Sequence, residues 1–329
     1  MKKIIGSFLS SIYGACVSLC RSSYRLFPFR TRKVKARVIS VGNITWGGTG
    51  KTPLTIKLSR DLAYYGKKVA VLTRGYGADE VAELRKKLPN IPVLVGRDRV
   101  KTAREAVEKY QAEYLILDDG FQHWRLHRDL DIVNINSTLP FGTGGLIPSG
   151  NLREPLENLA RADVFMLTKS NIGAKNLSWI RQKLLAIKPG ALIFEAVHKP
   201  MRFVDVLRNR TVTLGEMRGR KVATICGIGD PYAFEKTVEQ IGAEIVLAAR
   251  FDDHHNYTEV ELMEFAAQAK NLGARDVVTT EKDFLRMEPL LRGKTTENLG
   301  QLNLMVLEIE FQVHDEEDFI RRCLNSSGR

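Results

Sequence analysis

A glycine-rich segment between two regular elements constrains this fold more than any other feature of the chain. Residues 41–53 read VGNITWGGTGKTP, directly after an apolar run at 36–41 and directly before a helical stretch at 51–65. A strand, a glycine-rich turn ending in Gly-Lys-Thr and a helix together form a phosphate-binding loop. We therefore expect a parallel α/β sheet that binds a nucleotide at the carboxyl ends of its strands.

The loop residues have separate roles in holding ATP and Mg²⁺. Glycines let backbone N–H groups turn inward around phosphate oxygens, and the helix N-terminus adds a partial positive charge. Lys51 can reach the β- and γ-phosphates, and Thr52 can hold Mg²⁺. The usual pattern begins with Gly where this chain has Thr45. The residues expected to bind ATP in this loop are Thr45, Trp46, Gly47, Gly48, Thr49, Gly50, Lys51 and Thr52.

The rest of the chain alternates short apolar runs with helical stretches. Runs that are apolar throughout are typical of strands buried on both faces of a parallel sheet, and the alternation predicts βαβ units. The first series has strands at 36–41, 69–73, 92–95, 114–118, 131–136 and 163–168 and helices at 51–65, 98–110 and 175–188. The second has strands at 221–226, 244–248, 275–280 and 303–313 and helices at 231–241 and 258–272, the latter with a Thr-Glu capping box, before a C-terminal helix.

A length of 329 residues suggests two domains, and the Lys/Arg-rich stretch at 199–220 is the expected boundary. We predict a phosphate-loop NTPase-like parallel-sheet domain at 38–200 and a second, smaller α/β domain at 201–329. A basic amphipathic segment at 1–37 precedes them.

Two adjacent acids end one of the predicted strands. Residues 114–123 read YLILDDGFQH. An acid at the carboxyl end of such a strand faces Mg²⁺ in phosphate-loop enzymes, so Asp118 or Asp119 is expected near the metal. Gln122 and His123 are expected near the phosphates. The alternative is a simple turn, because Asp-Asp-Gly is favourable turn chemistry.

Most of the net charge of +12 lies at the N-terminus. Residues 1–60 contain twelve Lys/Arg and no acid, whereas 61–329 are neutral, so a nucleic-acid partner is not expected. On a helix, residues 4–20 place Ile4, Ile5, Phe8, Leu9, Ile12, Tyr13, Cys16 and Cys20 on one side and serines with Gly14 on the other. An apolar face beside many cations suits an anionic membrane surface. A helix docked on the protein core and a signal peptide are the alternatives.

Further short strings follow the predicted strands, and together they resemble one family. They are RGYG (74–77), GRDR (96–99), GNLREP (150–155), GIGDPYAFE (227–235), FDDHHNY (251–257) and TTEKD (279–283). With the loop and DDGFQH, they resemble the tetraacyldisaccharide 4'-kinase (lipid A 4'-kinase) family. The resemblance implies ATP- and Mg²⁺-dependent phosphorylation of the 4'-hydroxyl of a tetraacyl glucosamine-disaccharide 1-phosphate in lipid A biosynthesis. It also implies two domains closing over the nucleotide and a peripheral protein on the cytoplasmic face of the inner membrane. It implies no protein partner.

The resemblance also implies catalytic residues beyond Lys51. Asp79 matches the family's proposed general base, and His254 matches the histidine that pairs with it, with His255 as an adjacent alternative. Asp79 could instead only begin a helix. The arginines that could bind the lipid's phosphate or the transition-state charge are Arg74, Arg97, Arg99 and Arg153, although Arg153 could form an ion pair with Glu154. Residues 281–283 could line the expected cleft between the two domains near the nucleotide, or they could cap a helix.

Two other functions are compatible with a phosphate loop. A soluble kinase or ligase of a small metabolite would have no use for the N-terminal segment. A nucleotide-switched membrane ATPase of the partitioning type carries a lysine where this chain has Trp46, so that function is disfavoured.

Overall fold

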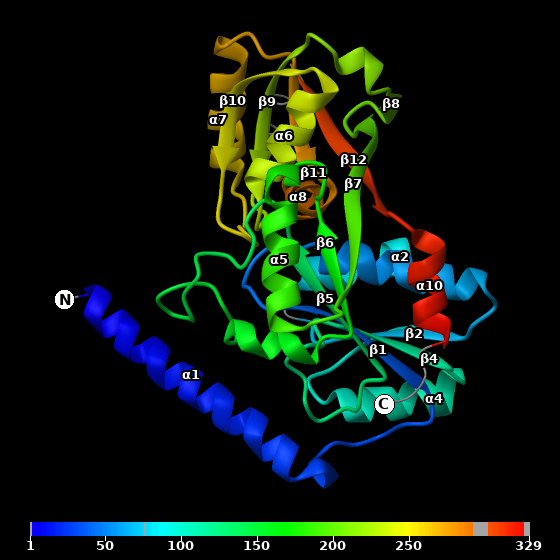
Figure 1. The fold of residues 1–329 in the computed structure, drawn as a ribbon. Helices are drawn as coiled ribbons and strands as arrows, with labels where there is room; N and C mark the ends of the chain where they lie inside the picture. Colours follow the sequence, from blue (N-terminus) through cyan, green and yellow to red (C-terminus); the bar gives the residue numbers. More distant parts are fainter. Residues whose placement is uncertain (1, 76, 292–301, 326–329) are drawn as a thin grey trace. The chain divides into compact units, whose positions relative to one another are not determined.

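The computed structural model describes residues 2–75, 77–291 and 302–325 (Figure 1). It divides into two compact units, the first formed by residues 1–197 with 311–329 and the second by residues 198–310. The sequence placed the C-terminal stretch in the second domain, whereas this division groups it with the first unit.

The first unit is built on a parallel sheet with β1 near its centre. Its strands are β1 (Arg37–Asn43), β2 (Val69–Thr73), β3 (Val93–Val95), β4 (Tyr114–Asp118), β5 (Leu130–Asn136), β6 (Val164–Thr168) and the first part of β7 (Leu192–Asp205). They lie in the order β7-β6-β5-β1-β4-β2-β3. The six strands predicted in this region are confirmed, and their pairings are parallel.

Helices cover both faces of this sheet. The helices of this unit are α1 (Lys2–Leu26), α2 (Lys51–Tyr64), α3 (Ala78–Lys87), α4 (Arg99–Tyr110), α5 (Leu177–Ile187) and α10 (Glu316–Asn325), with 3₁₀ turns at Pro28–Arg30, Leu156–Arg161 and Ala174–Asn176. Alternate residues of β4 show the layering. Ile116 packs with α2 and α10, whereas Leu115 and Leu117 pack with α4 on the other face. Burial on both faces explains why these strands are mostly apolar.

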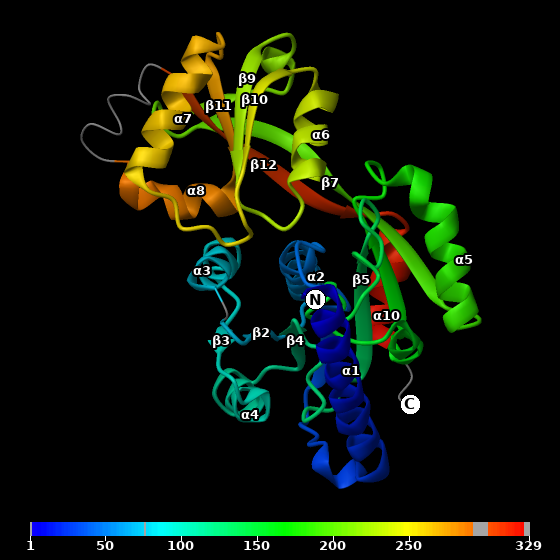
Figure 2. The same ribbon diagram turned by 90° about the vertical axis from the view of Figure 1, so that its left-hand side faces the viewer.

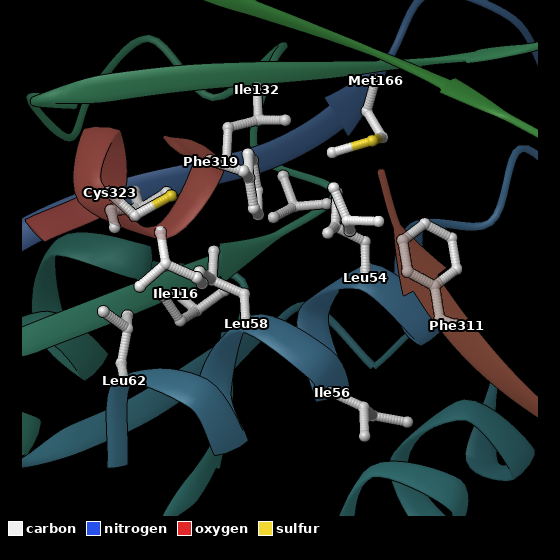
Figure 3. Packing of buried hydrophobic residues seen from close by; sticks show 14 of the residues in the cluster. Leu54, Ile56, Leu58, Leu62, Ile116, Ile132, Met166, Phe311, Phe319 and Cys323 are labelled. Atoms are coloured by element: carbon white, nitrogen blue, oxygen red, sulfur yellow. The ribbon is translucent and has the colours of Figure 1, made fainter. Parts of the chain in front are cut away.

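The core on the α2 face joins distant parts of the sequence. Leu54, Leu58 and Leu62 of α2 point toward the sheet and meet Phe319 and Cys323 of α10 (Figure 3). Phe319 is fully buried and packs edge-on against Phe194 of β7, with ring centroids 5.4 Å apart. The last helix is therefore an integral part of the first unit's core.

The second unit is a smaller α/β layer structure. Its strands are β8 (Arg210–Val212), β9 (Lys221–Cys226), β10 (Glu244–Arg250), β11 (Asp276–Thr280) and β12 (Asn303–Val313), and the last residues of β12 belong to the first unit. Its helices are α6 (Pro231–Ile241), α7 (Glu259–Asn271) and α8 (Glu281–Met287), with 3₁₀ turns at Gly215–Met217 and Glu288–Leu290. The parallel order is β10-β9-β11-β12, and β8 runs antiparallel to β7. The capping box predicted at Thr258 and Glu261 is present at the start of α7.

The N-terminal helix docks on the first unit through its small residues. Ser10 Oγ donates a hydrogen bond to the Leu146 carbonyl at 2.8 Å and accepts one from the Ser149 N–H at 3.0 Å. A Cβ on Gly14 would come within 2.8 Å of the Leu146 side chain, so glycine permits this approach. The docked-helix alternative is therefore confirmed for this side of α1, and Figures 1 and 2 show the helix on the outside of the first unit.

The opposite side of α1 is apolar and exposed. Phe8 is 66% exposed and Leu19 is 70% exposed, with Leu9, Ile12 and Cys16 exposed beside them. Tyr13 was assigned to this face, but its hydroxyl donates to the Arg153 carbonyl at 2.9 Å on the docked side. The side chains of Ile4 and Ile5 lie outside the described residues. Among the helices that the structure describes, none is long and apolar enough to cross a bilayer.

Phe319→Ala should destabilise the first unit strongly. The change leaves a cavity in the core beneath α2, and burial of a phenylalanine of this kind stabilises a protein by about 3–5 kcal/mol. The measurement is thermal or urea unfolding. Arg321→Ala is the matched control, because Arg321 is exposed and its ion pair with Asp318 lies on the surface of the same helix. Equal stability of the two variants would contradict the assignment of α10 to the core.

Candidate functional site

The phosphate loop lies between the end of β1 and the start of α2. Gly47 has φ 111° and Gly50 has φ 77°, left-handed values that favour glycine. Gly50 immediately precedes α2, so the helix N-terminus opens onto the loop. Thr45 and Thr49 are buried, whereas Trp46 is exposed. The first turn of α2 presents Lys51 and Thr52, as the sequence predicts.

The segment 146–153 supports this loop from outside. The Trp46 N–H donates to the Asn151 carbonyl at 2.6 Å, and Thr45 forms an isolated bridge with Leu152. This is also the segment on which α1 docks. It therefore connects the N-terminal helix to the phosphate loop.

The two acids at the end of β4 point to different environments. Asp118 is buried and accepts hydrogen bonds from Thr55 Oγ1 at 3.2 Å and Thr73 Oγ1 at 3.3 Å. Burial, with smaller contributions from the negative charges of Glu80 and Asp119, raises the pKa of Asp118 to about 6.

Asp119 faces two cations. It has φ 53° and accepts two hydrogen bonds from Arg153, at 2.6 Å and 3.0 Å. The Lys51 ammonium lies 3.6 Å from the same carboxylate. Burial acts to raise the pKa of Asp119, but the charges of Lys51 and Arg153 outweigh it and lower the pKa to about 2. Asp119 is therefore ionised over the whole physiological range.

Arg153 is held in the site by its backbone as well as its side chain. Its N–H donates to the Ile44 carbonyl at 2.8 Å, and its guanidinium also donates to Asn43 Oδ1 at 3.1 Å. Glu154, which was considered as its ion-pair partner, is bonded to Arg161 at 2.7 Å. Sequence reasoning missed the pairing of Arg153 with Asp119, because the two residues are far apart in the chain.

Gln122 and His123 follow the acids in a turn beside β1. Gln122 Nε2 donates to the Asn43 carbonyl at 2.9 Å. Burial, together with the positive charges of Arg99, Arg128 and Arg125, lowers the pKa of His123 to about 4, so its ring is neutral at pH 7. Gln122 Oε1 and Thr49 Oγ1 are buried without a hydrogen-bond partner among the residues that the structure describes. Buried polar atoms of this kind commonly await a ligand or water.

The other predicted residues of the first unit differ in exposure. Arg74 and Arg97 are exposed, and Tyr76 of the RGYG string lies outside the described residues. Arg99 is buried and donates to the Gly96 carbonyl at the start of α4. Asp79 lies in the first turn of α3, so the helix-start alternative is confirmed for its backbone, and its side chain is partly buried.

In the second unit, the two adjacent histidines have different partners. His254 is exposed, has φ 66°, and its Nε2 lies 3.3 Å from the Lys282 ammonium. His255 stacks on Phe251 at 4.3 Å and contacts Glu261 at 3.2 Å.

The TTEKD string begins a helix. The Thr280 hydroxyl accepts from the Asp283 N–H at 3.1 Å and caps α8, so the helix-cap alternative is confirmed. The Asp283 carboxylate is buried and accepts from Tyr257 OH and the Gly227 N–H, both at 3.0 Å.

The donors beside the phosphate loop fit Mg²⁺ when a nucleotide is bound. Within residues 2–75, 77–291 and 302–325, no group of three or more His, Cys, Asp or Glu side chains could hold a metal ion. Magnesium at nucleotide sites is usually held by one or two carboxylates together with phosphate oxygens and waters. Asp118 and Asp119 carry carboxylates of this kind, and the hydroxyl of Thr52 lies at the start of α2 beside the loop.

This site and the sheet that carries it define a phosphate-loop nucleotide-binding protein of the α/β class. The sequence model of the tetraacyldisaccharide-1-P 4'-kinase family matches residues 3–83 and 78–327. The chain belongs to this family, which confirms the resemblance found in the sequence.

Relatives match over most of their length. The tetraacyldisaccharide 4'-kinase of Halothermothrix orenii is 36% identical, over 95% of this chain and 89% of the relative. That of Anaeromyxobacter sp. (strain Fw109-5) is 40% identical, over 88% and 82%. The crystal structure of LpxK from Aquifex aeolicus in complex with ATP has a TM-score of 0.70 at 26% identity and covers 98% of this chain and 99% of that one. The predicted fold class is confirmed.

Asp118→Asn should stabilise the protein at pH 8 but not at pH 4. A carboxyl with a raised pKa is protonated without cost at low pH, and its stabilising contribution is lost as pH rises through about 6. The difference between pKa values of about 4 and 6 corresponds to a change of about 3 kcal/mol at most in the free energy of unfolding. Chemical unfolding at several pH values measures it.

Asp119→Asn is the matched comparison, with the opposite sign. The pKa of Asp119 is lowered, so its contribution is present above pH 4 and is lost only as pH falls toward 2. This variant should be less stable than the wild type at pH 8. If both variants shift stability in the same direction at pH 8, the electrostatic contrast between the two acids is wrong.

Proposed function

We propose that this protein transfers the γ-phosphate of ATP to the 4'-hydroxyl of a tetraacyl glucosamine-disaccharide 1-phosphate, a step of lipid A biosynthesis. The observation that carries the proposal is a formed phosphate loop in a chain of the tetraacyldisaccharide 4'-kinase family, with Lys51 already beside the acid pair. The relative from Aquifex aeolicus was solved in complex with ATP, which supports ATP as the donor.

Lys51 has a defined task when ATP binds. Its ammonium lies 3.6 Å from Asp119 and exchanges part of this contact for the β- and γ-phosphates. Arg153 stays bonded to Asp119 and keeps that carboxylate in place. Thr52 with Asp118 or Asp119 would hold Mg²⁺, which neutralises the charge that develops on the phosphate oxygens.

Asp79 accepts the proton of the sugar hydroxyl in this proposal. A hydroxyl is a weak nucleophile, and a carboxylate base within hydrogen-bond reach typically accelerates its reaction by about 10²–10⁴-fold. Asp79 is the second residue of α3, two residues after the RGYG string, and it is partly buried.

We assign His254 to orienting that base, the role that its match to the family's histidine implies. The Lys282 ammonium has donors only, so His254 Nε2 accepts from it and the proton of a neutral ring lies on Nδ1. An Nδ1–H group can donate to a carboxylate. His255 already contacts Glu261, which favours His254 for this role.

Arginines supply the contacts to the acceptor's phosphate. Arg74 and Arg97 are exposed, so we assign them to the lipid 1-phosphate. Arg99 and Arg153 already bond to protein groups, so we assign them to holding the site in shape.

The exposed face of α1 brings the enzyme to its lipid acceptor. Its apolar residues lie opposite the docked serine and glycine side, and several arginines and lysines follow the helix before β1. An apolar helix face with cations nearby binds anionic lipid surfaces. We therefore infer that the protein is peripheral on the cytoplasmic face of the inner membrane.

The kinase assignment is tested with labelled ATP and the tetraacyl disaccharide 1-phosphate. Asp79→Asn should lower kcat by about 10²–10⁴-fold with little change in the KM for ATP, because it removes the base and leaves the phosphate loop intact. Glu83→Gln, one turn further along α3, is the control and should retain normal kcat. A near-normal kcat of Asp79→Asn would refute the base. Wild-type enzyme that never labels the lipid would refute the substrate.

Replacing the exposed apolar residues of α1 should release the protein from membranes. Phe8→Asp with Leu19→Asp removes two side chains whose burial in lipid is favourable by about 1.5–3 kcal/mol each, so the vesicle-bound fraction should fall steeply. Co-sedimentation with vesicles containing anionic lipid measures it. Ser11→Asp with Ser18→Asp adds the same charge to the same helix away from the apolar face and should retain more binding. Equal binding by the two double variants would contradict a membrane role for this face.

A further inference from the structure

The carbonyl groups of the phosphate loop need partners of their own. If the loop's N–H groups face the phosphates, the carbonyls between them face the protein. Carbonyls buried without donors are costly, so a loop of this kind requires donors on the side away from the nucleotide.

Three side chains at the ends of β5 and β6 supply these donors. Lys169 Nζ donates to the Gly48 carbonyl at 3.0 Å. Thr168 Oγ1 donates to the Thr49 carbonyl at 3.1 Å, and Asn134 Nδ2 approaches the same carbonyl at 3.3 Å. Two successive carbonyls of the loop are therefore held from the neighbouring strands.

Lys169 is unusual for a lysine in its burial and in its backbone. It is only 6% exposed, and its φ of 55° lies in the left-handed region, where lysine is uncommon. Left-handed residues other than glycine are kept in place by their surroundings and are frequent at functional sites. A buried ammonium also requires hydrogen bonds or nearby negative charge, and a bound triphosphate would provide such charge on the other side of the loop.

We propose that Lys169, supported by Thr168 and Asn134, is a positioning residue for ATP: it fixes the phosphate loop with its amides turned toward the triphosphate. The inference rests on the proposed function only in taking ATP as the ligand. In this role Lys169 strengthens the binding of ATP and takes no direct part in phosphoryl transfer. The loop is organised before ATP arrives, so little binding free energy is spent on ordering it.

The experiment compares Lys169→Met with Lys175→Met. Methionine keeps much of the lysine's length and removes its donor, and Lys175 is an exposed lysine six residues further along the chain. The dissociation constant of ATP is measured by calorimetry without any lipid. A hydrogen bond to a charged group stabilises by about 1.5–3 kcal/mol, so Lys169→Met should weaken ATP binding by about 10- to 100-fold and Lys175→Met should leave it unchanged.

Two further readouts separate positioning from general stability. Kinetics should show a raised KM for ATP with kcat at saturating ATP much less affected, and Lys169→Arg should recover part of the affinity. Thr168→Val removes only a hydroxyl, so it should weaken ATP binding in the same direction even if Lys169→Met folds poorly. Wild-type binding of ATP with unchanged affinities in Lys169→Met and Thr168→Val would overturn the inference. A wild-type protein that does not bind ATP would instead refute the proposed function.

Discussion

The direction of the backbone groups in the phosphate loop is the constraint on which the rest of the site depends. The amides can face a triphosphate only where the intervening carbonyls accept hydrogen bonds from other groups. Here Thr168 and Lys169, at the end of β6, donate those hydrogen bonds. This explains why the loop follows a central strand. Because β1 lies beside β5, and β5 beside β6, the strand ends that carry the donors lie on one side of the loop. The parallel sheet therefore shapes the loop as well as carrying it.

The acid pair combines two opposite electrostatic environments within two residues. Asp119 is held ionised by Lys51 and Arg153, whereas Asp118 lies among threonine hydroxyls in a buried position. A cation that binds with ATP would favour ionisation of Asp118. Without that cation, the buried negative charge of Asp118 destabilises the folded protein at neutral pH. A destabilising residue of this type is common where function, rather than stability, determines which residue is kept.

Much of the fold could be predicted from the sequence, and the failures have physical causes. Strands buried on both faces are mostly apolar, so β1, β2 and β4 to β6 were recognisable. Most residues of β7 are partly or fully exposed, and its second part was assigned to a linker. The loop and the acids were found from short motifs, but the Asp119–Arg153 pair and the donors of Lys169 depend on contacts between distant segments. On α1, periodicity placed Tyr13 with the apolar residues, whereas its hydroxyl makes it suitable for docking.

The participation of the last helix in the first core has a consequence for biosynthesis. Phe311, Phe319 and Cys323 fill space beneath α2, the helix that follows the phosphate loop. When residues 1–197 have been translated, the first unit therefore still lacks the C-terminal residues that complete its core. The nascent chain must wait for the whole second unit to be translated before that core is filled, and until then its exposed apolar surface is a substrate for chaperones.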